Sequence, residues 1–391
     1  MYESESTRIP CVIMRGGTSK GVYLLGNHLP SSPDIRDRVI LSIFGSPDTR
    51  QIDGLGGADP LTSKVAVIGP SSRPDADIEY TFGQVDIKSS FIDYSSNCGN
   101  ISSGAGPFAI SQGLVKAVSP LTRIRIYNTN TDKIFEAEVP VRDGIPVSEG
   151  CYRIDGVPGT GAKISLNLAG AVGSKTGKLL PTGHPTDTLN IEGFGPLDVS
   201  LVDAASPMVF VRAQDIGLTG AESPADIDQS PDMLALLEEI RAQGAVTMGI
   251  APDKDTAKKN VRAVPMVAFV APPHAYTSHL TEETISASSV DILSRDMFMQ
   301  IMHKTYSGTA TVCTGCAAVT PGTLVQKAMG RETASGIIRI GHPGGIIEID
   351  MERNEQGIIT RAVIGRTARR IMEGYVYVPT KLFDMHRTVI S

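Results

Sequence analysis

Residues Asn97–Val115 read NCGNISSGAGPFAISQGLV, a stretch rich in small residues that contains no charged side chain. A helix without a polar face is usually buried on all sides. Gly104, Gly106 and Pro107 are poor helix formers, so packing must hold the segment where intrinsic propensity does not. The stretch therefore predicts a buried helix inside a sheet that wraps around it.

A second small-residue segment, Val312–Met329, reads VCTGCAAVTPGTLVQKAM. Like the first, it has a start rich in Cys and Gly that leads into an apolar helix. Between the two, Gly150–Gly195 is rich in Gly, Pro and Thr, which is typical of a domain boundary. We expect an N-terminal lobe over residues 1–190 and a C-terminal lobe over residues 191–375. The remaining segment, 376–391, is expected to pack back on the first lobe.

Many short strands are predicted on both sides of that boundary. Runs rich in Val, Ile, Tyr and Phe, separated by Gly, Pro or Asp, are typical of strands. They occur at Ile9–Met14, Gly21–Leu25, Ser63–Ile68, Asp77–Phe82, Gln84–Ile87, Phe91–Tyr94, Arg123–Asn128, Leu197–Asp203, Met208–Arg212, Val264–Ala271, Gly336–Ile340 and Ile346–Met351. Helical spacing of apolar residues predicts further helices at Asp34–Phe44, at Pro231–Gln243 and near Arg295–Lys304. The mixture indicates an α+β fold.

Composition excludes several classes of protein. The chain has 391 residues and a formal net charge of −6, which makes it a poor candidate for nucleic-acid binding. No apolar run approaches the ~18 residues that a membrane span needs, and the polar first ten residues do not resemble a signal peptide. Five cysteines are too few, and odd in number, for a disulfide framework. We expect a cytoplasmic protein with reduced thiols that acts on a small molecule.

Cys98 is the first candidate catalytic residue. It follows Asn97, a plausible N-cap, and would lie in the first turn of the predicted helix. Unpaired N–H groups and the positive end of the helix dipole favour the thiolate form at that position. Gly99 lets a ligand approach the backbone closely. A lone cysteine is more often a small buried hydrophobe, but the Asn-Cys-Gly-Asn setting offers no apolar neighbour.

Lys64 and two glycine turns are further candidates. Lys64 starts a predicted strand and is either a solvated edge residue or a partly desolvated base. The turn Arg15–Lys20, RGGTSK, offers amides, hydroxyls and a guanidinium that match a carboxylate. The turn Gly341–Gly345, GHPGG, offers amides and the His342 imidazole. Either turn could instead be an ordinary tight turn, with His342 exposed.

The remaining motifs do not indicate a bound cofactor. Gly104-x-Gly106-x-x-Ala109 fits the dinucleotide fingerprint superficially, but it lies inside the predicted helix and not at a strand-to-helix turn. No His and carboxylate cluster has metal-ligand spacing. Cys313 and Cys316 have C-x-x-C spacing without a thioredoxin-like surrounding. We treat Cys313 as a candidate second site residue and Cys316 as core, and expect neither cofactor nor metal.

Five segments together resemble a known family. They are MRGGTSKG (Met14–Gly21), QIDGLGGADPLTSK (Gln51–Lys64), NCGN (Asn97–Asn100), GHPGG (Gly341–Gly345) and RTARRIMEGYVYVP (Arg366–Pro379). The family is that of 2-methylaconitate cis–trans isomerases and 3-methylitaconate Δ-isomerases, with 4-oxalomesaconate tautomerases and aconitate isomerases in the same group. The likeness runs from about Ile9 to Pro379. It implies the diaminopimelate-epimerase-like fold, in which two similar lobes each wrap a curved, mostly antiparallel sheet around a central helix.

The resemblance also implies roles for individual residues. The catalytic pair of the family falls on Lys64 and Cys98. The predicted binding residues are Arg15, Gly17, Thr18, Ser19, Asn97, Gly99, Asn100, Thr311, Gly341, His342 and Gly344. In the epimerases of this fold a second cysteine opens the other helix, and Cys313 lies near that place as a candidate second acid. The Thr-Gly-Cys that follows it departs from the epimerase pattern, which argues against a two-cysteine racemase.

The resulting prediction is a cofactor-independent isomerase that moves a proton across an allylic system in an unsaturated di- or tricarboxylate. A 3-methylitaconate Δ-isomerase-like activity is favoured. The alternatives are a 2-methylaconitate cis–trans isomerase, a 4-oxalomesaconate tautomerase or an aconitate isomerase. An amino-acid epimerase and a non-catalytic carboxylate-binding protein rank lower. A homodimer or a higher oligomer is left open.

Overall fold

The computed structural model describes residues 5–95 and 97–383. Its helices are α1 (Pro33–Phe44), α2 (Gly99–Ser111), α3 (Pro224–Asp228), α4 (Pro231–Thr247), α5 (Lys254–Asn260), α6 (Gly308–Ala318) and α7 (Leu324–Met329). The strands before residue 170 are β1 (Ser6–Gly16), β2 (Ser19–Leu25), β3 (Lys64–Pro70), β4 (Ile78–Val85), β5 (Ile92–Asp93), β6 (Leu121–Asn128), β7 (Lys133–Arg142), β8 (Ile145–Pro146), β9 (Tyr152–Arg153), β10 (Thr160–Gly161) and β11 (Ile164–Asn167). The later strands are β12 (Asp187–Ile191), β13 (Gly195–Ala204), β14 (Ser206–Arg212), β15 (Met266–Ala271), β16 (Tyr276–Thr277), β17 (Thr284–Ile285), β18 (Ile292–Phe298), β19 (Ile301–Met302), β20 (Ser335–His342), β21 (Gly345–Arg353), β22 (Ile359–Arg366) and β23 (Ala368–Pro379).

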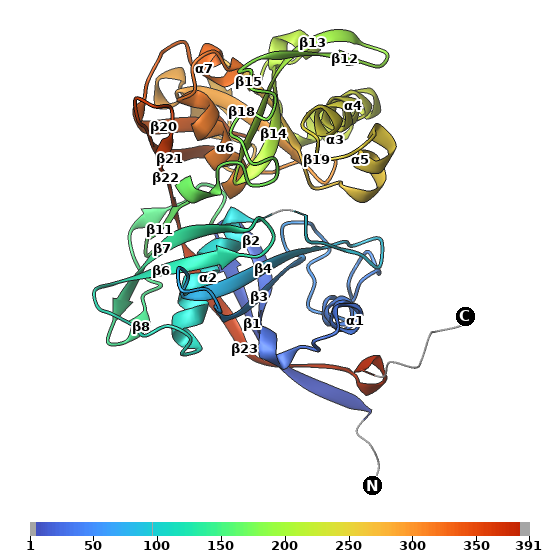
Figure 1. The fold of residues 1–391 in the computed structure, drawn as a ribbon, viewed down its shortest axis with the longest axis vertical. Coiled ribbons are helices and arrows are strands. Elements are labelled where there is room, and N and C mark those ends of the chain that lie inside the picture. The colour runs from blue at the N-terminus through green and yellow to red at the C-terminus, as the bar shows by residue number, and fades with distance from the viewer. Residues whose placement is uncertain (1–4, 96, 384–391) are drawn as a thin grey trace.

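Helix α2 is buried from its first residue to Ile110, which confirms the burial predicted from its composition. It packs against β1, β2, β3, β4, β7, β8 and β23. Its glycines allow this close packing, because a Cβ on Gly104 would collide with the ring of Tyr23 and one on Gly106 would press on Val139. Figure 1 shows α2 in the lower half of the molecule among these strands. Tertiary packing thus outweighs the low helix propensity of the segment.

Helix α6 is likewise buried throughout, and it packs against β13, β14, β20, β21 and β22. The bounds predicted for it were wrong. The helix begins at Gly308, not Val312, because Ser307 caps it, and a break around Pro321 separates it from α7. Pro321 cannot donate the hydrogen bond that would continue a helix. Figure 1 shows α6 in the upper half of the molecule.

The helix predicted near Arg295–Lys304 was also wrong. The chain there forms β18 and the short β19, and β18 pairs antiparallel with β15 and parallel with β20. Arg295 is fully buried and its guanidinium donates to the carbonyl oxygens of Glu222, Ser294 and Gly341. These long-range contacts fix a strand where the local apolar spacing also fitted a helix.

Most other predicted elements are confirmed, including α1, α4 and the strands around them. Asp77–Phe82 and Gln84–Ile87 are one strand, β4, because Gly83 continues the pairing with β3. The predicted boundary Gly150–Gly195 is not purely a loop. It contains β11, which pairs with β7 on one side and β22 on the other.

The last described strand returns to the first. β23 pairs antiparallel with β1 from Ser6 opposite Pro379 to Gly16 opposite Ala368. Val376 and Val378 pack with the buried side chains of α1. In Figure 1 this strand runs from the strands around α6 down to those around α2. Residues 384–391 of the segment expected to pack back lie outside the described residues.

Candidate active site

Lys64 and Cys98 line one cavity between α2 and α6. The cavity is also lined by Ser19, Asn97, Gly99, Asn100, Ser206, Met266, Phe298, His303, Ser307 and Thr309. Its volume of about 20 Å³ is enough for one water molecule. The structure therefore holds these side chains around a small space.

The two buried helices meet at this cavity through their N-termini. The prediction that Asn97 is the N-cap of α2 was wrong, because the N-cap is Cys98. Asn97 Oδ1 instead accepts from the Cys98 backbone N–H at 2.7 Å and from Ser102 Oγ at 3.2 Å. A Cβ on Gly99 or on Gly308 would lie about 3.0 Å from the backbone of the other residue. Glycine at both positions lets the first turns, with their unpaired N–H groups, approach each other.

Lys64 is a buried amine, so it is not the solvated edge residue that its sequence position also allowed. Its side chain is 2% exposed, and Nζ donates to Gln84 Oε1 at 2.6 Å. Nζ also lies 4.8 Å from the ring centre of Phe298. Burial lowers the pKa of Lys64, and nearby Cys98 and Asp59 oppose that shift. A lowered pKa makes the free amine, a proton acceptor, more available near neutral pH.

His303 lines the cavity and was missed by the sequence analysis. It is buried, and its Nδ1 accepts from the backbone N–H of Thr305 at 3.1 Å. Burial and the charge of Lys64 lower the pKa of His303 to about 3. The imidazole is therefore neutral at ordinary pH. No local signal indicated His303, because it lay at the end of the helix that was wrongly predicted near Arg295–Lys304.

Arg366 and Asn100 link the Arg15–Lys20 turn to the cavity. Asn100 Nδ2 donates to Thr18 Oγ1 at 3.0 Å, and Arg366 Nε donates to Asn100 Oδ1 at 3.0 Å. Burial lowers the pKa of Arg366 to about 10. Arg366 Nη2 and Ser19 Oγ are buried without a hydrogen-bond partner among the described residues. Because buried polar groups are nearly always satisfied, the Ser19 hydroxyl in the cavity wall is suited to a ligand.

Several predicted residues do not line the cavity. Arg15 Nη1 donates to the carbonyl oxygens of Gly17 and Thr367, so these three stabilise the turn itself. Thr311 Oγ1 donates to the Ser307 carbonyl inside α6.

The glycine turn after β20 also packs away from the cavity. The interpretation of His342 as exposed is wrong, because it is 2% exposed and stacks on Tyr306. Its Nδ1 accepts from the backbone N–H of Gly344 at 3.1 Å. Gly341 packs against Leu293 and Tyr276. The imidazole thus stabilises the turn itself.

Cys313 is placed differently from its prediction as a residue near a helix start. It lies in the interior of α6, fully buried, with Sγ donating to the Val202 carbonyl at 3.4 Å. Burial raises the pKa of this thiol well above its usual range. At the start of α6, the position that corresponds to Cys98 on α2 is occupied by Ser307. The structure therefore brings one cysteine, not two, to the cavity.

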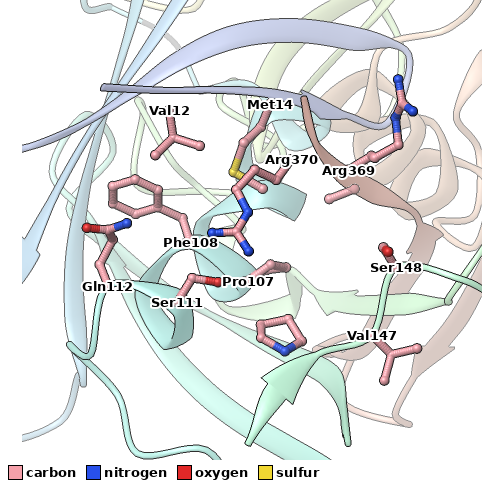
Figure 2. A pocket seen from close by; sticks show the side chains of 12 residues that line it. Val12, Met14, Pro107, Phe108, Ser111, Gln112, Val147, Ser148, Arg369 and Arg370 are labelled. Atoms are coloured by element: carbon pink, nitrogen blue, oxygen red, sulfur yellow. The ribbon is translucent and has the colours of Figure 1, made fainter. Parts of the chain in front are cut away.

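Larger hollows lie elsewhere. One of about 710 Å³ is bordered by residues 153–160, by several residues between Ser278 and Ile285, and by residues 344–346. Another, of about 260 Å³, lies at the C-terminal end of α2, where Figure 2 shows Pro107 and Phe108 facing Val12 and Met14 of β1 and Arg370 of β23. Neither hollow is lined by Lys64 or Cys98. The small cavity is the candidate active site because of the side chains that line it, and not because of its size.

Residues 5–95 and 97–383 show neither a metal-binding cluster nor a membrane-spanning helix. No group of three or more His, Cys, Asp or Glu side chains is arranged to hold a metal ion there. No helix in that part of the chain is long and apolar enough to cross a membrane.

The arrangement has two chemical capacities. A buried amine and a thiol can exchange protons with a carbon acid placed between them. The amides at the two helix N-termini and the Ser19 hydroxyl can hold an anion and stabilise negative charge as it develops. Both capacities belong to the same small cavity.

Comparison with known proteins gives consistent matches along the chain. The sequence model of the PrpF protein family matches residues 6–379. A 3-methylitaconate isomerase from Eubacterium barkeri is 53% identical over 375 residues, which are 96% of this chain and 98% of that protein. A 2-methyl-aconitate isomerase from Shewanella oneidensis is 37% identical over 388 residues, 95% of this chain and 97% of that protein. The crystal structure of a methylitaconate-delta-isomerase superposes with a TM-score of 0.83 at 52% identity and covers 99% of this chain and 100% of that one.

Proposed function

Because the chain belongs to the PrpF family, we propose that it is a cofactor-independent isomerase that shifts a proton across an allylic system in an unsaturated di- or tricarboxylate. The favoured substrate is 3-methylitaconate, the acid in the name of the relative that is 53% identical. The observation that carries the proposal is the shared cavity of Lys64 and Cys98 at the meeting point of two helix N-termini.

The proposed reaction is a balanced isomerisation. In 3-methylitaconate, a proton leaves the carbon that bears both the methyl group and a carboxylate. The double bond moves to that carbon, and a proton arrives at the terminal methylene, which becomes a second methyl group. The product is a 2,3-dimethylbutenedioate. No electron enters or leaves, so an acid and a base suffice.

The difficult step is the removal of a proton beside an existing carboxylate, because it adds negative charge to an anion. Preorganised donors aimed at that charge lower the barrier. The first amides of α2 and α6 and the hydroxyl of Ser19 supply such donors around the cavity. In this proposal they bind the carboxylates and the charge that develops next to them.

Lys64 and Cys98 are the proposed acid and base. Burial keeps part of the Lys64 population as free amine by lowering its pKa, so it can accept the proton. Either one of the two groups carries the proton between the carbons, or one removes it and the other delivers a new one. His303 is proposed as a neutral neighbour of Lys64 that adds no competing positive charge.

We further propose that the strands around α2 and those around α6 act as two lobes, each with a central helix, that open to admit the substrate. The cavity of about 20 Å³ is too small for a dicarboxylate. Lys304 reaches Asp59 at 2.7 Å and Arg262 reaches Asp86 at 3.3 Å across the two sets of strands. The Lys304–Asp59 pair is exposed and weak enough to break on opening. The Arg262–Asp86 pair, in which Asp86 is buried, would separate at a higher cost. All five cysteines are unpaired, which fits the proposed cytoplasmic location.

The test is a substrate panel followed by proton NMR. Purified protein is incubated in D₂O with 3-methylitaconate, 2-methylaconitate, 4-oxalomesaconate, trans-aconitate and a set of amino acids including proline. Isomerisation of at least one unsaturated acid is expected, with 3-methylitaconate fastest. Exchange of an amino-acid α-proton without any isomerisation would instead support the epimerase alternative. Ligand-induced shifts without turnover would support a binding protein.

A further inference from the structure

The cavity has one wall that takes no part in the proposed proton chemistry. Met266 and Phe298 line it, and they are the apolar side chains of that wall. Met266 is the first residue of β15 and Phe298 the last of β18. The antiparallel register pairs Val267 with Met297, which sets Met266 opposite Phe298 on the same face of the sheet. The start of β15 and the end of β18 therefore form an apolar surface inside an otherwise polar cavity.

This surface adjoins the proposed base. The Lys64 Nζ lies 4.8 Å from the centre of the Phe298 ring. Met266 is 3% exposed, so its side chain is fixed by packing and not by solvent. Met266 and Phe298 thus line the same small cavity as Lys64 and Cys98, so they are positioned to contact a substituent of a carbon that exchanges its proton there.

We propose that Met266 and Phe298 form an alkyl subsite that selects the substituent on the carbon that loses its proton. This inference rests on the proposed function and deepens it. It assigns the enzyme to unsaturated dicarboxylates with a small alkyl group at that carbon, in preference to acids that carry hydrogen or a further carboxylate there.

The energetic argument has two parts. A methyl group that fills an apolar subsite contributes about a 10- to 200-fold preference over hydrogen. A carboxylate in the same place would lose its hydration without a dedicated partner, which is costly. Lys64 is the only Lys or Arg among the described residues that line the cavity, and its Nζ already donates to Gln84. The wall therefore favours methyl over both alternatives.

The first test measures the ratio of kcat/KM for 3-methylitaconate to that for itaconate, which lacks the methyl group. The wild-type ratio is expected to lie between about 10 and 200. Met266→Ala and Phe298→Ala should each lower it at least about fivefold, within the range that one lost apolar contact gives. Because both substrates are measured on one sample, partial unfolding of a variant cancels in the ratio. Met266→Val, a milder truncation, serves if the alanine variant does not fold.

Met297→Ala is the matched control. Met297 is the neighbour of Phe298 in β18, but it points to the other side of the sheet and packs in the cluster of Leu237 and Phe269. Its truncation removes as many atoms from a buried site as Met266→Ala does. The control should keep the wild-type ratio. An unchanged ratio in Met266→Ala and Phe298→Ala, or an equal fall in Met297→Ala, overturns the alkyl subsite.

The second test reverses a preference. A substrate with ethyl in place of methyl should be poor for the wild type and should gain at least about tenfold in kcat/KM relative to methyl in Met266→Ala, because the truncation makes room for one carbon. An analogue that carries a carboxylate in place of that methyl group should be at least about 100-fold poorer than 3-methylitaconate. Equal rates for these two acids overturn the inference while the proposed function stands. Turnover of none of the unsaturated acids rejects both.

Discussion

At the scale of single residues, Cys98 offers a clean separation of chemistry from folding. It caps α2 through its backbone, and its side chain makes no cap hydrogen bond. Serine is a better N-cap residue than most. Cys98→Ser should therefore leave the melting temperature close to that of the wild type, while kcat falls about 10²- to 10⁴-fold through loss of acid–base catalysis. The measurements are a thermal melt and turnover by proton NMR, and near-normal turnover would remove Cys98 from the mechanism.

His303 predicts a pH dependence of stability. Its pKa falls from 6.5 to about 3 on folding, so below pH 6.5 the unfolded chain binds a proton that the folded chain refuses. The free energy of unfolding should decrease as pH falls from 6.5 toward 3, by about 1.4 kcal/mol per pH unit for one proton.

The comparison that isolates this effect is wild type against His303→Gln in urea melts at several pH values. Asp296 acts in the opposite direction, because burial raises its pKa to about 7, but it is present in both proteins and cancels in their difference. The difference in unfolding free energy should shrink as the pH is lowered. A constant difference across pH 4 to 7 would contradict the buried neutral imidazole.

Residues with a local signature were found from the sequence, and those without one were not. Cys98 and Ser19 lie in the short glycine-containing motifs NCGN and RGGTSK, which are recognisable in the sequence. His303 and Arg366 come to the site only because strands from distant parts of the chain end there. Arg366 opens the RTARRIMEGYVYVP segment, but nothing in that segment or around His303 indicates which side chain lies at the cavity.

At the scale of secondary-structure elements, the meeting of α2 and α6 predicts an effect of Gly308→Ala. The new Cβ would lie about 3.0 Å from the backbone of Gly99 and push the two N-termini apart. Activity should fall about 10- to 100-fold, because misplacement by a fraction of an ångström is costly for positioned groups.

Gly26→Ala is the control, since a Cβ there has ordinary contacts, the nearest being 3.6 Å away at Val67. It should keep its activity. Circular dichroism spectra of both variants report whether the fold is retained. If Gly308→Ala were as active as Gly26→Ala, the close approach of the helices would have no part in catalysis.

A helix or strand could be predicted from the sequence where a property of its own residues, such as the absence of charge, determines its structure. The absence of charge in Asn97–Val115 pointed directly to the burial of α2. The start of α6 was predicted too late, because Ser and Gly are typical of loops. The close approach of Gly308 to Gly99, which the sequence does not show, places both residues at the helix start. For β18, the decisive contacts of Arg295 come from residues up to 73 positions away.

At the scale of the whole molecule, the small volume of the cavity predicts that a covalent tie across it abolishes turnover. Thr18 Oγ1 and Thr305 Oγ1 are in hydrogen-bond contact at 3.2 Å, so cysteines at these two positions are the choice for a cross-link. The oxidised Thr18→Cys/Thr305→Cys protein should lose more than about nine-tenths of the activity of its reduced form, because substrate entry needs opening.

The reduced form of the same protein is the reference, so the direct cost of the two substitutions cancels. Each single cysteine variant, oxidised in parallel, controls for damage to Cys98. Full activity in the cross-linked protein would show that substrate enters without separation of the two sets of strands.

The pairing of β1 with β23 has a consequence for biosynthesis. Thr7 and Thr380, which meet at one end of this ladder, are separated by 373 positions along the chain. As the ribosome emits the polypeptide from its amino end, the outer edge of β1 has no partner until nearly all of the chain has emerged. Chaperones that shield nascent strands would therefore be needed for longest at residues 6–16, and stalled translation products that lack β23 should be prone to aggregation.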